Sequence, residues 1–427
     1  MGYGRDVYDL RERLAGVRDS RQEPVTSADL VAASIFFCGL LRVRSLNALE
    51  PKLGEKTFRR LVGAPPQLEV LRSADTLSRS LRKMALETVR GVSLGMVTKA
   101  ERNKVFREGW VGALRYMALD GWEPIRSWLR HCKHCLTRQV KMKGRRGEIV
   151  ERTEYYHRFA VALLIDERFD LALDIEPVLP KDLRAGPERD KHHEGELTAA
   201  RRLLRRVKKT FSWIDVVVAD GLYPNGPFLT DVQQLGMSSV IVLQKDTDEP
   251  LKEALALWAD KPTAQVVRDE KSGECIELWD CPQIQTLDTY RGPIRVVRAR
   301  VTPLSDPKAD SHTWCLAVTG EAATRLSARQ VLRVARGRWK IENTGFHQWT
   351  TRWRFAHVFV HDADGLLALY WLFFAAFNLL TFFLYRQLRC YGRDRGKNVT
   401  RTISRLVDEM LDDLARLDCS PWDPDPG

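Results

Sequence analysis

Apolar residues recur at helical spacing through the first quarter of the chain. Between Val25 and about Val97 they fall three or four positions apart, and Ser27 precedes an apolar run that extends to Leu41, where it can cap a helix. This pattern predicts a helical N-terminal domain, which we place at residues 1–108.

The pattern then changes to that of β-strands. Tyr116 to Leu119 is a short apolar run that predicts a buried strand ending on Asp120. Two longer runs, Tyr155 to Asp166 and Phe169 to Val178, are separated by a tight charged turn. Their length and spacing predict a β-hairpin.

A second acid follows a strand, after a helix with two unlike faces. In Glu196 to Lys209 the apolar residues share one face, and the opposite face is strongly basic. The β-branched run Trp213 to Ala219 predicts a strand that ends on Asp220, which is again followed by glycine. A helix over Gly226 to Leu235 and a strand over Ser239 to Gln244 come next.

A third acid lies on a helix near the end of the chain. This long helix is expected to start near Ser327 and to carry Glu342. More residues separate Asp220 from Glu342 than one strand and a helix need, so we expect an inserted β-rich subdomain at about residues 246–325. Its three β-like runs are Cys275 to Trp279, Ile294 to Val301 and Thr313 to Thr319.

Two strands that each deliver an aspartate, followed far downstream by a helix that carries a glutamate, resemble the order of a ribonuclease-H-like nuclease core. We therefore expect an α/β fold with a ribonuclease-H-like catalytic domain at 109–390. A polar C-terminal tail with a short helix is expected at 391–427.

The charge of the chain favours a polyanionic partner. Lys and Arg outnumber Asp and Glu by 68 to 56, a formal net charge of +12. Nucleic acid and an anionic membrane surface both fit this excess, and simple solubility is an equally good explanation. The eight cysteines lack the dense spacing of a secreted disulfide scaffold, so we expect a cytoplasmic, reducing location.

One apolar stretch offers a competing interpretation. Leu366 to Tyr385 is twenty residues without a charge, which meets the length criterion for a membrane-spanning helix. A helix that is apolar all round can also be buried inside a large protein. We favour burial, and keep a single-span membrane protein as the alternative.

The three acids suit metal-dependent phosphodiester chemistry. Two divalent ions about 3.5–4 Å apart can activate a nucleophile and stabilise the leaving oxygen, and Mg²⁺ prefers carboxylate oxygens. Taken singly, an Asp-Gly pair after a strand is more often a turn. Asp120 has the least support of the three acids, because its predicted strand is short and Glu123 lies three residues away.

The residues around Glu342 are the most informative. In Arg336-Gly-Arg338-Trp-Lys340-Ile-Glu342-Asn-Thr-Gly-Phe-His, Arg338 lies four positions before Glu342 and therefore on the same helix face. An ordinary ion pair on a solvated helix would have the same spacing. The flanking tryptophan and Gly-Phe pair favour a functional site.

This string resembles the C-terminal signature of DDE-type insertion-sequence transposases, in the group with a Tyr-x2-Arg-x3-Glu-x6-Lys motif. The segments ALDGWE and VVADGLYPNGPF follow in the family's order. The resemblance implies that Asp120, Asp220 and Glu342 are the catalytic and metal-binding triad. It also implies two Mg²⁺ ions, for which Mn²⁺ can substitute.

The resemblance implies a DNA transposase that cuts at transposon ends and joins them to target DNA. Its partners would be double-stranded DNA, namely terminal inverted repeats and target, and a second copy in the DNA complex, without a membrane. The expected location is cytoplasmic and nucleoid-associated. We assign DNA binding to the basic helix at Glu196 to Lys209, to the N-terminal helices and to six residues: Arg336, Arg338, Lys340, Tyr223, Trp122 and Trp349.

Two positions depart from the motif. Its tyrosine would fall on Ala335 and its lysine on Trp349. The alternative is therefore a catalytically impaired, DNA-binding transposase remnant.

A cysteine and histidine cluster forms a separate feature. His131-Cys132-Lys133-His134-Cys135 contains one CxxC, which could supply two ligands of a structural zinc ion if a distant pair supplied the others. A zinc-ribbon spacing calls for a second such knuckle, which the sequence lacks. We therefore expect Cys132 and Cys135 to serve packing, with zinc as the alternative, and we expect His157 to be a core or hairpin residue.

Overall fold

The computed structural model describes most of the chain. It covers residues 2–387 except 66–72, 145–146, 185–191, 245–247, 260–264, 286, 288 and 307–308, together with 408–410 and 412. Most of the C-terminal tail expected at 391–427 lies outside the described residues.

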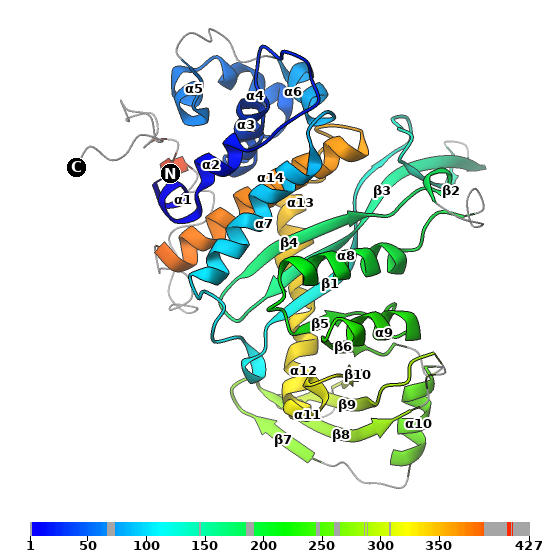
Figure 1. Ribbon diagram of the computed structural model, residues 1–427. Coiled ribbons are helices and arrows are strands. Elements are labelled where there is room, and N and C mark those ends of the chain that lie inside the picture. Colours follow the sequence, from blue (N-terminus) through cyan, green and yellow to red (C-terminus); the bar gives the residue numbers. More distant parts are fainter. Residues whose placement is uncertain are drawn as a thin grey trace.

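The elements that the structure describes in the first hundred residues are helices, as predicted for Val25 to Val97. The helices are α1 (Gly2–Tyr8), α2 (Leu10–Ala15), α3 (Ala28–Leu40), α4 (Leu46–Leu53), α5 (Lys56–Val62), α6 (Ala74–Leu81) and α7 (Leu86–Arg102). Figure 1 shows them gathered at one end of the molecule, beside α14 (Ala363–Phe382). Nearly every residue of α3 is buried, because this helix is apolar on all sides.

A ten-stranded mixed sheet forms the rest of the framework, in the order β2-β3-β1-β5-β6-β10-β9-β8-β7, with β4 paired to β3. The first five strands are β1 (Tyr116–Ser127), β2 (Leu136–Lys143), β3 (Ile149–Ile165), β4 (Asp170–Pro177) and β5 (Val216–Ala219). The other five are β6 (Ser238–Val242), β7 (Gln265–Asp269), β8 (Glu274–Ile284), β9 (Ile294–Pro303) and β10 (His312–Thr319). The molecule is therefore a mixed α/β protein with one large sheet.

The long strand β3 organises one half of this sheet. Along one edge it pairs with β2 through Ile149 to Tyr156 and with β4 through Phe159 to Ile165, both antiparallel. Along its other edge it pairs with β1. The antiparallel pairing of β3 with β4 confirms the predicted hairpin.

The β-rich stretch expected at 246–325 extends the same sheet. Strand β10 pairs antiparallel with β6, and β9, β8 and β7 follow outward in turn. The helix α10 (Glu249–Trp258) precedes these strands and packs on β8 and β9. The inserted residues thus continue the central sheet through backbone hydrogen bonds.

Helices cover the sheet and connect its strands. They are α8 (Glu196–Thr210), α9 (Gly226–Gln234), α11 (Ala322–Arg325), α12 (Ala328–Gly337), the π-helical turn η3 (Ile341–His347), α13 (Gln348–Thr351) and η4 (Phe383–Gln387), with short 3₁₀ turns at η1 (Val111–Ala113) and η2 (Lys181–Leu183). Ser327 caps α12 in a capping box with Gln330. The helix predicted to start near Ser327 is therefore present, but it changes to a π-helical turn around Glu342.

The apolar stretch Leu366 to Tyr385 forms the inner helix α14. Among the described residues, Ala363–Gln387 is the one helical segment long and apolar enough to cross a membrane, and 94% of its most apolar window is buried inside the protein. It packs against α7, α3 and β4. The prediction that this stretch is buried is confirmed.

Strand β1 is longer than the sequence predicts. It runs from Tyr116 to Ser127, so Asp120 lies within the strand and not at its end. Pairing with β3 continues past Asp120 to Trp122 and, after a bulge, from Ile125 onward. The polar residues beyond Asp120 interrupt the apolar run, but this long neighbour supplies the backbone partners that keep them extended.

One buried carboxylate joins three helices to the sheet. Asp174 in β4 is fully buried, and its Oδ2 accepts hydrogen bonds from Arg90 of α7 at 2.8 Å and from Arg206 of α8 at 2.8 Å. Its Oδ1 accepts one from Trp371 Nε1 of α14 at 3.0 Å. A buried charge with this many donors is compensated, whereas removal of that charge weakens the pairing of every donor around it.

Replacement of this carboxylate should therefore be strongly destabilising. Asp174→Asn keeps the side-chain volume but removes the buried charge that Arg90 and Arg206 share, which leaves Arg90 only the exposed Glu87 and Arg206 only Glu176, so the free energy of unfolding should fall by about 3–5 kcal/mol. Urea denaturation followed by circular dichroism measures this change. The matched control is Glu87→Gln, because Glu87 pairs with the same Arg90 but is 83% exposed, and its loss should cost under about 1 kcal/mol. Equal losses in both variants would contradict a central role for Asp174.

Candidate active site

Two neighbouring parallel strands place the first two acids. Strand β1 pairs parallel with β5, with Ala118 opposite Val218. Asp120 and Asp220 each lie two residues further along their strands, so both fall at the same edge of the sheet. Asp120 Oδ1 accepts a hydrogen bond from Gly121 N at 2.8 Å, and Asp220 Oδ1 accepts one from Leu222 N at 2.9 Å.

Arg338 connects the third acid to the first. Its Nη1 forms an ion pair with Glu342 Oε1 at 2.7 Å and donates a hydrogen bond to Asp120 Oδ2 at 3.1 Å. The predicted proximity of Arg338 and Glu342 on one helical face is thus confirmed. The guanidinium is 7% exposed and lies over the Trp339 ring, 4.9 Å from its centroid. This buried cation therefore pairs with two carboxylates, of which Asp120 is 15% and Glu342 35% exposed.

Asp120 holds its proton unusually tightly. Burial raises the pKa of Asp120 to about 7 from its ordinary 3.8, because a desolvated carboxylate is disfavoured. The hydrogen bond from Gly121 and the charge of Arg338 oppose this rise, while the charges of Asp220 and Glu196 add to it. The last two contributions show that three acids, Asp120, Asp220 and Glu196, act on one another at this edge of the sheet.

Glu196 is the site residue that the sequence did not reveal. It begins α8, and Tyr223 Oη donates to its Oε1 at 2.9 Å. Burial raises the pKa of Glu196, and the charge of Asp220 adds to the rise. A Cβ atom on Gly121 would lie only 1.9 Å from Glu196 Oε2, so the glycine after Asp120 leaves room for this carboxylate. Gly121 was the one sequence feature that could have indicated a close neighbour of Asp120. It could not indicate which residue that neighbour is.

The donor set fits a hard divalent cation. Asp120, Asp220, Glu196 and Glu342 offer only carboxylate oxygens, which Mg²⁺ prefers. Two of the four have raised pKa values because burial and like charges disfavour their ionised forms, and a bound cation relieves both effects. Arg338 already contacts Asp120 and Glu342 together, so a cation shared by these two acids would require the guanidinium to move aside.

The other cations assigned to DNA are engaged within the protein. Arg336 donates to Glu274 at 2.8 and 3.2 Å. Lys340 donates to the backbone carbonyl of Asp166 and to Asp170 Oδ1, and it lies over the Trp110 ring. Their assignment to phosphate remains a prediction, since contact with DNA would compete with these pairs.

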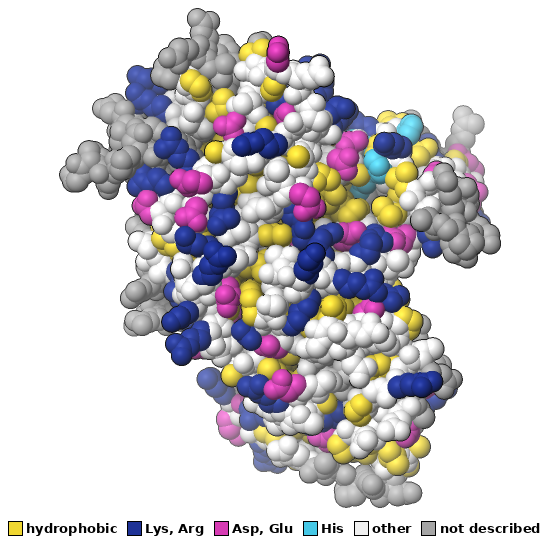
Figure 2. All heavy atoms as spheres, viewed as in Figure 1, with side chains coloured by type: hydrophobic (Ala, Val, Ile, Leu, Met, Phe, Trp, Pro, Cys, Tyr) yellow, Lys and Arg dark blue, Asp and Glu magenta, His cyan; other side chains and the backbone are white. Residues whose placement is uncertain are grey.

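The basic face of α8 is also neutralised internally. Arg201 and Arg205 both pair with Asp231 of α9. Arg202 and Arg206 pair with carboxylates on β4 and before α8, namely Asp174, Glu176 and Glu194. On the face drawn in Figure 2, Lys and Arg side chains are interspersed with Asp and Glu. The helix predicted as a basic surface therefore joins α9 to β4, and its contact with DNA stays a prediction.

The aromatic residues assigned to DNA lie in the core. Trp349 is fully buried and Trp122 is 5% exposed. They pack against each other and against Phe355, with ring centroids 5.4 to 6.0 Å apart. Tyr223 is also buried and holds Glu196. Stacking on a base would require Trp122 or Trp349 to leave the core, whereas Trp339 is 45% exposed and needs no such change.

The raised pKa of Asp120 should make stability depend on pH. The folded chain binds this proton more tightly than the unfolded chain, so the charged side chain costs stability as the pH rises from 3.8 towards 7. Asp120→Asn removes this cost. Without added divalent cation, the variant should gain stability relative to the wild type as the pH rises from about 4 to 7, and the difference should level off above that range.

Thermal unfolding at a series of pH values measures this difference. Asp310→Asn is the matched control because Asp310 is exposed in the segment before β10, and it should show no comparable trend. If Asp120→Asn differed from the wild type by the same amount at every pH, burial would not be controlling the Asp120 proton.

The comparisons with known proteins agree with this chemistry. No curated protein matches the chain. Residues 189–379 match the family model described as Transposase DDE domain. The matched segment contains Glu196, Asp220, Arg338 and Glu342 and begins after Asp120. The match supports a DDE-type transposase.

Proposed function

We propose that this protein is a DNA transposase that cuts DNA at the ends of its own element and joins those ends to target DNA. The observation that carries the proposal is the meeting of Asp120, Asp220 and the Arg338–Glu342 pair at one edge of the sheet. The transposase-domain match over 189–379 provides independent support.

The strand order supports a ribonuclease-H-like core. Strands β1, β3 and β4 form an antiparallel meander, with β3 between the other two. After α8 the chain returns to β5, parallel to β1, and after α9 to β6, parallel to β5. In this proposal the core is β4-β3-β1-β5-β6, and β2 and β7 to β10 are additions to it.

Asp120, Asp220 and Glu342 would hold the divalent cations in this core, and Glu196, whose charge acts on Asp120, would be a further candidate ligand. When bound, two Mg²⁺ ions supply an activated nucleophile and stabilise the leaving oxygen. The chain itself supplies position and charge. Parallel strands fix two of the acids, and Arg338 holds Glu342 against Asp120 until the site is filled. Arg338 would then be free to donate to a substrate phosphate.

The DNA contacts would combine phosphate binding by cations with base stacking by an aromatic side chain. The net charge of +12 favours a polyanion, and phosphate contacts position a protein on DNA without reading its sequence. Trp339, exposed beside Arg338, is well placed to stack on an unpaired base. Both ends of an element must be held together, so we propose a dimer in the DNA complex.

A genomic observation tests the proposal before any biochemistry. Inverted repeats should flank the coding region, and a short direct duplication of target DNA should bound them. These repeats then define the DNA substrate for cleavage assays.

Loss of one carboxylate should abolish cleavage. On a duplex that carries those repeats, in Mg²⁺, Asp220→Asn should cut at least about a hundredfold more slowly than the wild type, because losing a metal ligand removes several kcal/mol of stabilisation. Strand cleavage resolved on denaturing gels measures the rate, and Asp310→Asn should keep the wild-type rate.

Two outcomes would count against the proposal. Full activity of Asp220→Asn would refute the triad assignment. A wild type that binds the repeats but never cuts them in Mg²⁺ or Mn²⁺ would instead favour the non-catalytic remnant that the changes at Ala335 and Trp349 suggest.

A further inference from the structure

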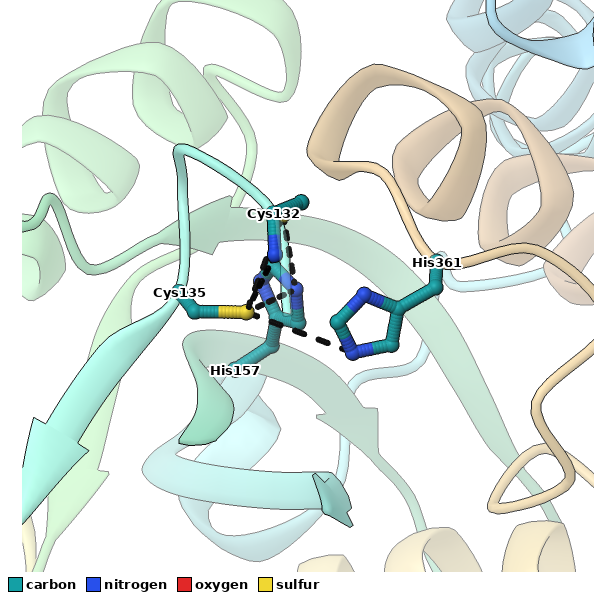
Figure 3. Close-up of side chains that lie close together, drawn as sticks. All are labelled: Cys132, Cys135, His157 and His361. Carbon is teal, nitrogen blue, oxygen red and sulfur yellow. Dashed lines mark hydrogen bonds between the residues drawn. The ribbon is translucent and has the colours of Figure 1, made fainter. Parts of the chain in front are cut away.

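Two cysteines and two histidines converge on one point away from the carboxylates. Cys132 and Cys135 lie in the turn between β1 and β2, His157 lies in β3, and His361 lies just before α14. Each offers one ligand atom, and the four atoms all lie within 4.8 Å of one another. Figure 3 shows both imidazole rings directed towards the two cysteines.

The distances match those of a tetrahedral zinc site. Zinc binds sulfur at about 2.3 Å and imidazole nitrogen at about 2.0–2.1 Å, so tetrahedral ligands lie about 3.8 Å apart for two sulfurs and about 3.6 Å apart for sulfur and nitrogen. The two sulfurs are 3.7 Å apart, and His157 Nε2 is 3.5 Å from each of them. His361 Nε2 is 4.0 Å from Cys135 Sγ.

Ordinary packing explains this arrangement less well. Thiols are weak hydrogen-bond donors, and four such groups facing one another gain little from mutual hydrogen bonds. His157 and Cys135 are only 4% and 7% exposed. The Nε2 atoms of both histidines face the sulfurs, which leaves Nδ1 to carry the proton when Nε2 binds a metal.

We propose that Cys132, Cys135, His157 and His361 bind a structural Zn²⁺ ion. Two thiolates and two imidazoles form a complete tetrahedral set and leave no open position for substrate, which is typical of structural sites. The proposed site is separate from the four carboxylates and does not depend on the proposed function. The sequence contains one CxxC pair and no second pair of closely spaced ligands. The other two proposed ligands are single histidines, one in a strand and one in a distant loop.

Zinc here would tie the segment that enters α14 to a turn and a strand that are already neighbours in the sheet. It would fix the turn after β1, the middle of β3 and the segment that enters α14, where Asp362 caps the helix. The first and last of these segments, with α4 and α6, line a cleft of about 990 Å³. Three cations, Arg82, Arg130 and Lys133, and two acids, Asp75 and Asp362, lie along this cleft, so the ion would set the shape of a polar groove beside the N-terminal helices.

Metal content of the full-length chain tests the proposal. The protein is purified under reducing conditions with a tag that does not bind metal, and zinc is measured by mass spectrometry. The wild type should carry about one zinc ion per chain. Cys135→Ser and His361→Gln should each lose at least about tenfold in zinc content, since each removes one of four ligands.

Two control variants separate this site from other sources of zinc. Cys275→Ser removes a cysteine of β8 outside the cluster, and Asp220→Asn removes an acid of the candidate active site. Both should retain the zinc of the wild type. Cobalt substitution of the wild type should give the visible absorption of a tetrahedral thiolate site, and this readout remains even if a ligand variant fails to fold.

The proposal is overturned if the reduced wild type neither carries zinc nor takes it up in a one-to-one ratio from added zinc chloride. It is also overturned if Cys135→Ser and His361→Gln keep their zinc, if cobalt gives only an octahedral spectrum, or if Cys132 and Cys135 form a disulfide in freshly prepared protein.

Discussion

The parallel pairing of β1 with β5 is the constraint on which the candidate site depends. It brings together two aspartates that lie a hundred residues apart, and it fixes which face of the sheet each one occupies. A shift of one residue in this register would turn one carboxylate to the opposite face. The apolar residues Met117, Ala118 and Val218 are fully buried, so such a shift would also expose core side chains. The packing of the core and the geometry of the acids are therefore specified by the same contacts.

Charge inside the molecule is arranged differently from what the composition suggests. The excess of Lys and Arg points to a polyanion, yet the arginines of α8 pair with carboxylates of β4 and α9. At the candidate site the balance is reversed, because two acids share one buried guanidinium. The net charge of the chain therefore does not describe the local charge at this site.

The sequence predicted the elements well where periodicity and caps were strong. The helix capped by Ser327, the β3–β4 hairpin and the burial of α14 all follow from the local pattern of apolar and polar residues.

The full length of β1 could not be predicted in this way, because its second half is polar and is kept extended by the neighbouring β3. The sequence also did not identify Glu196 as a site residue. An acid in the first turn of a helix gives the same sequence pattern whether its side chain faces solvent or another carboxylate. Trp349 was assigned to DNA because an aromatic side chain beside such a site can stack on a base, but it packs against Phe374 and Phe377. Such outcomes depend on contacts between distant segments, which no local window of sequence contains.

The cysteine and histidine cluster has a consequence for how the chain is made. Cys135 and His361 are 226 residues apart in sequence, and synthesis on the ribosome proceeds from the N-terminus at about 5–20 residues per second. The turn after β1 and the hairpin strand β3 can therefore assemble with three of the four side chains in place, well before His361 has been synthesised. The last side chain arrives together with α14, whose burial completes the core. A newly made chain would thus hold an incomplete, accessible thiol pair for many seconds, and the entry of α14 would close that pair off at the moment the fold is finished.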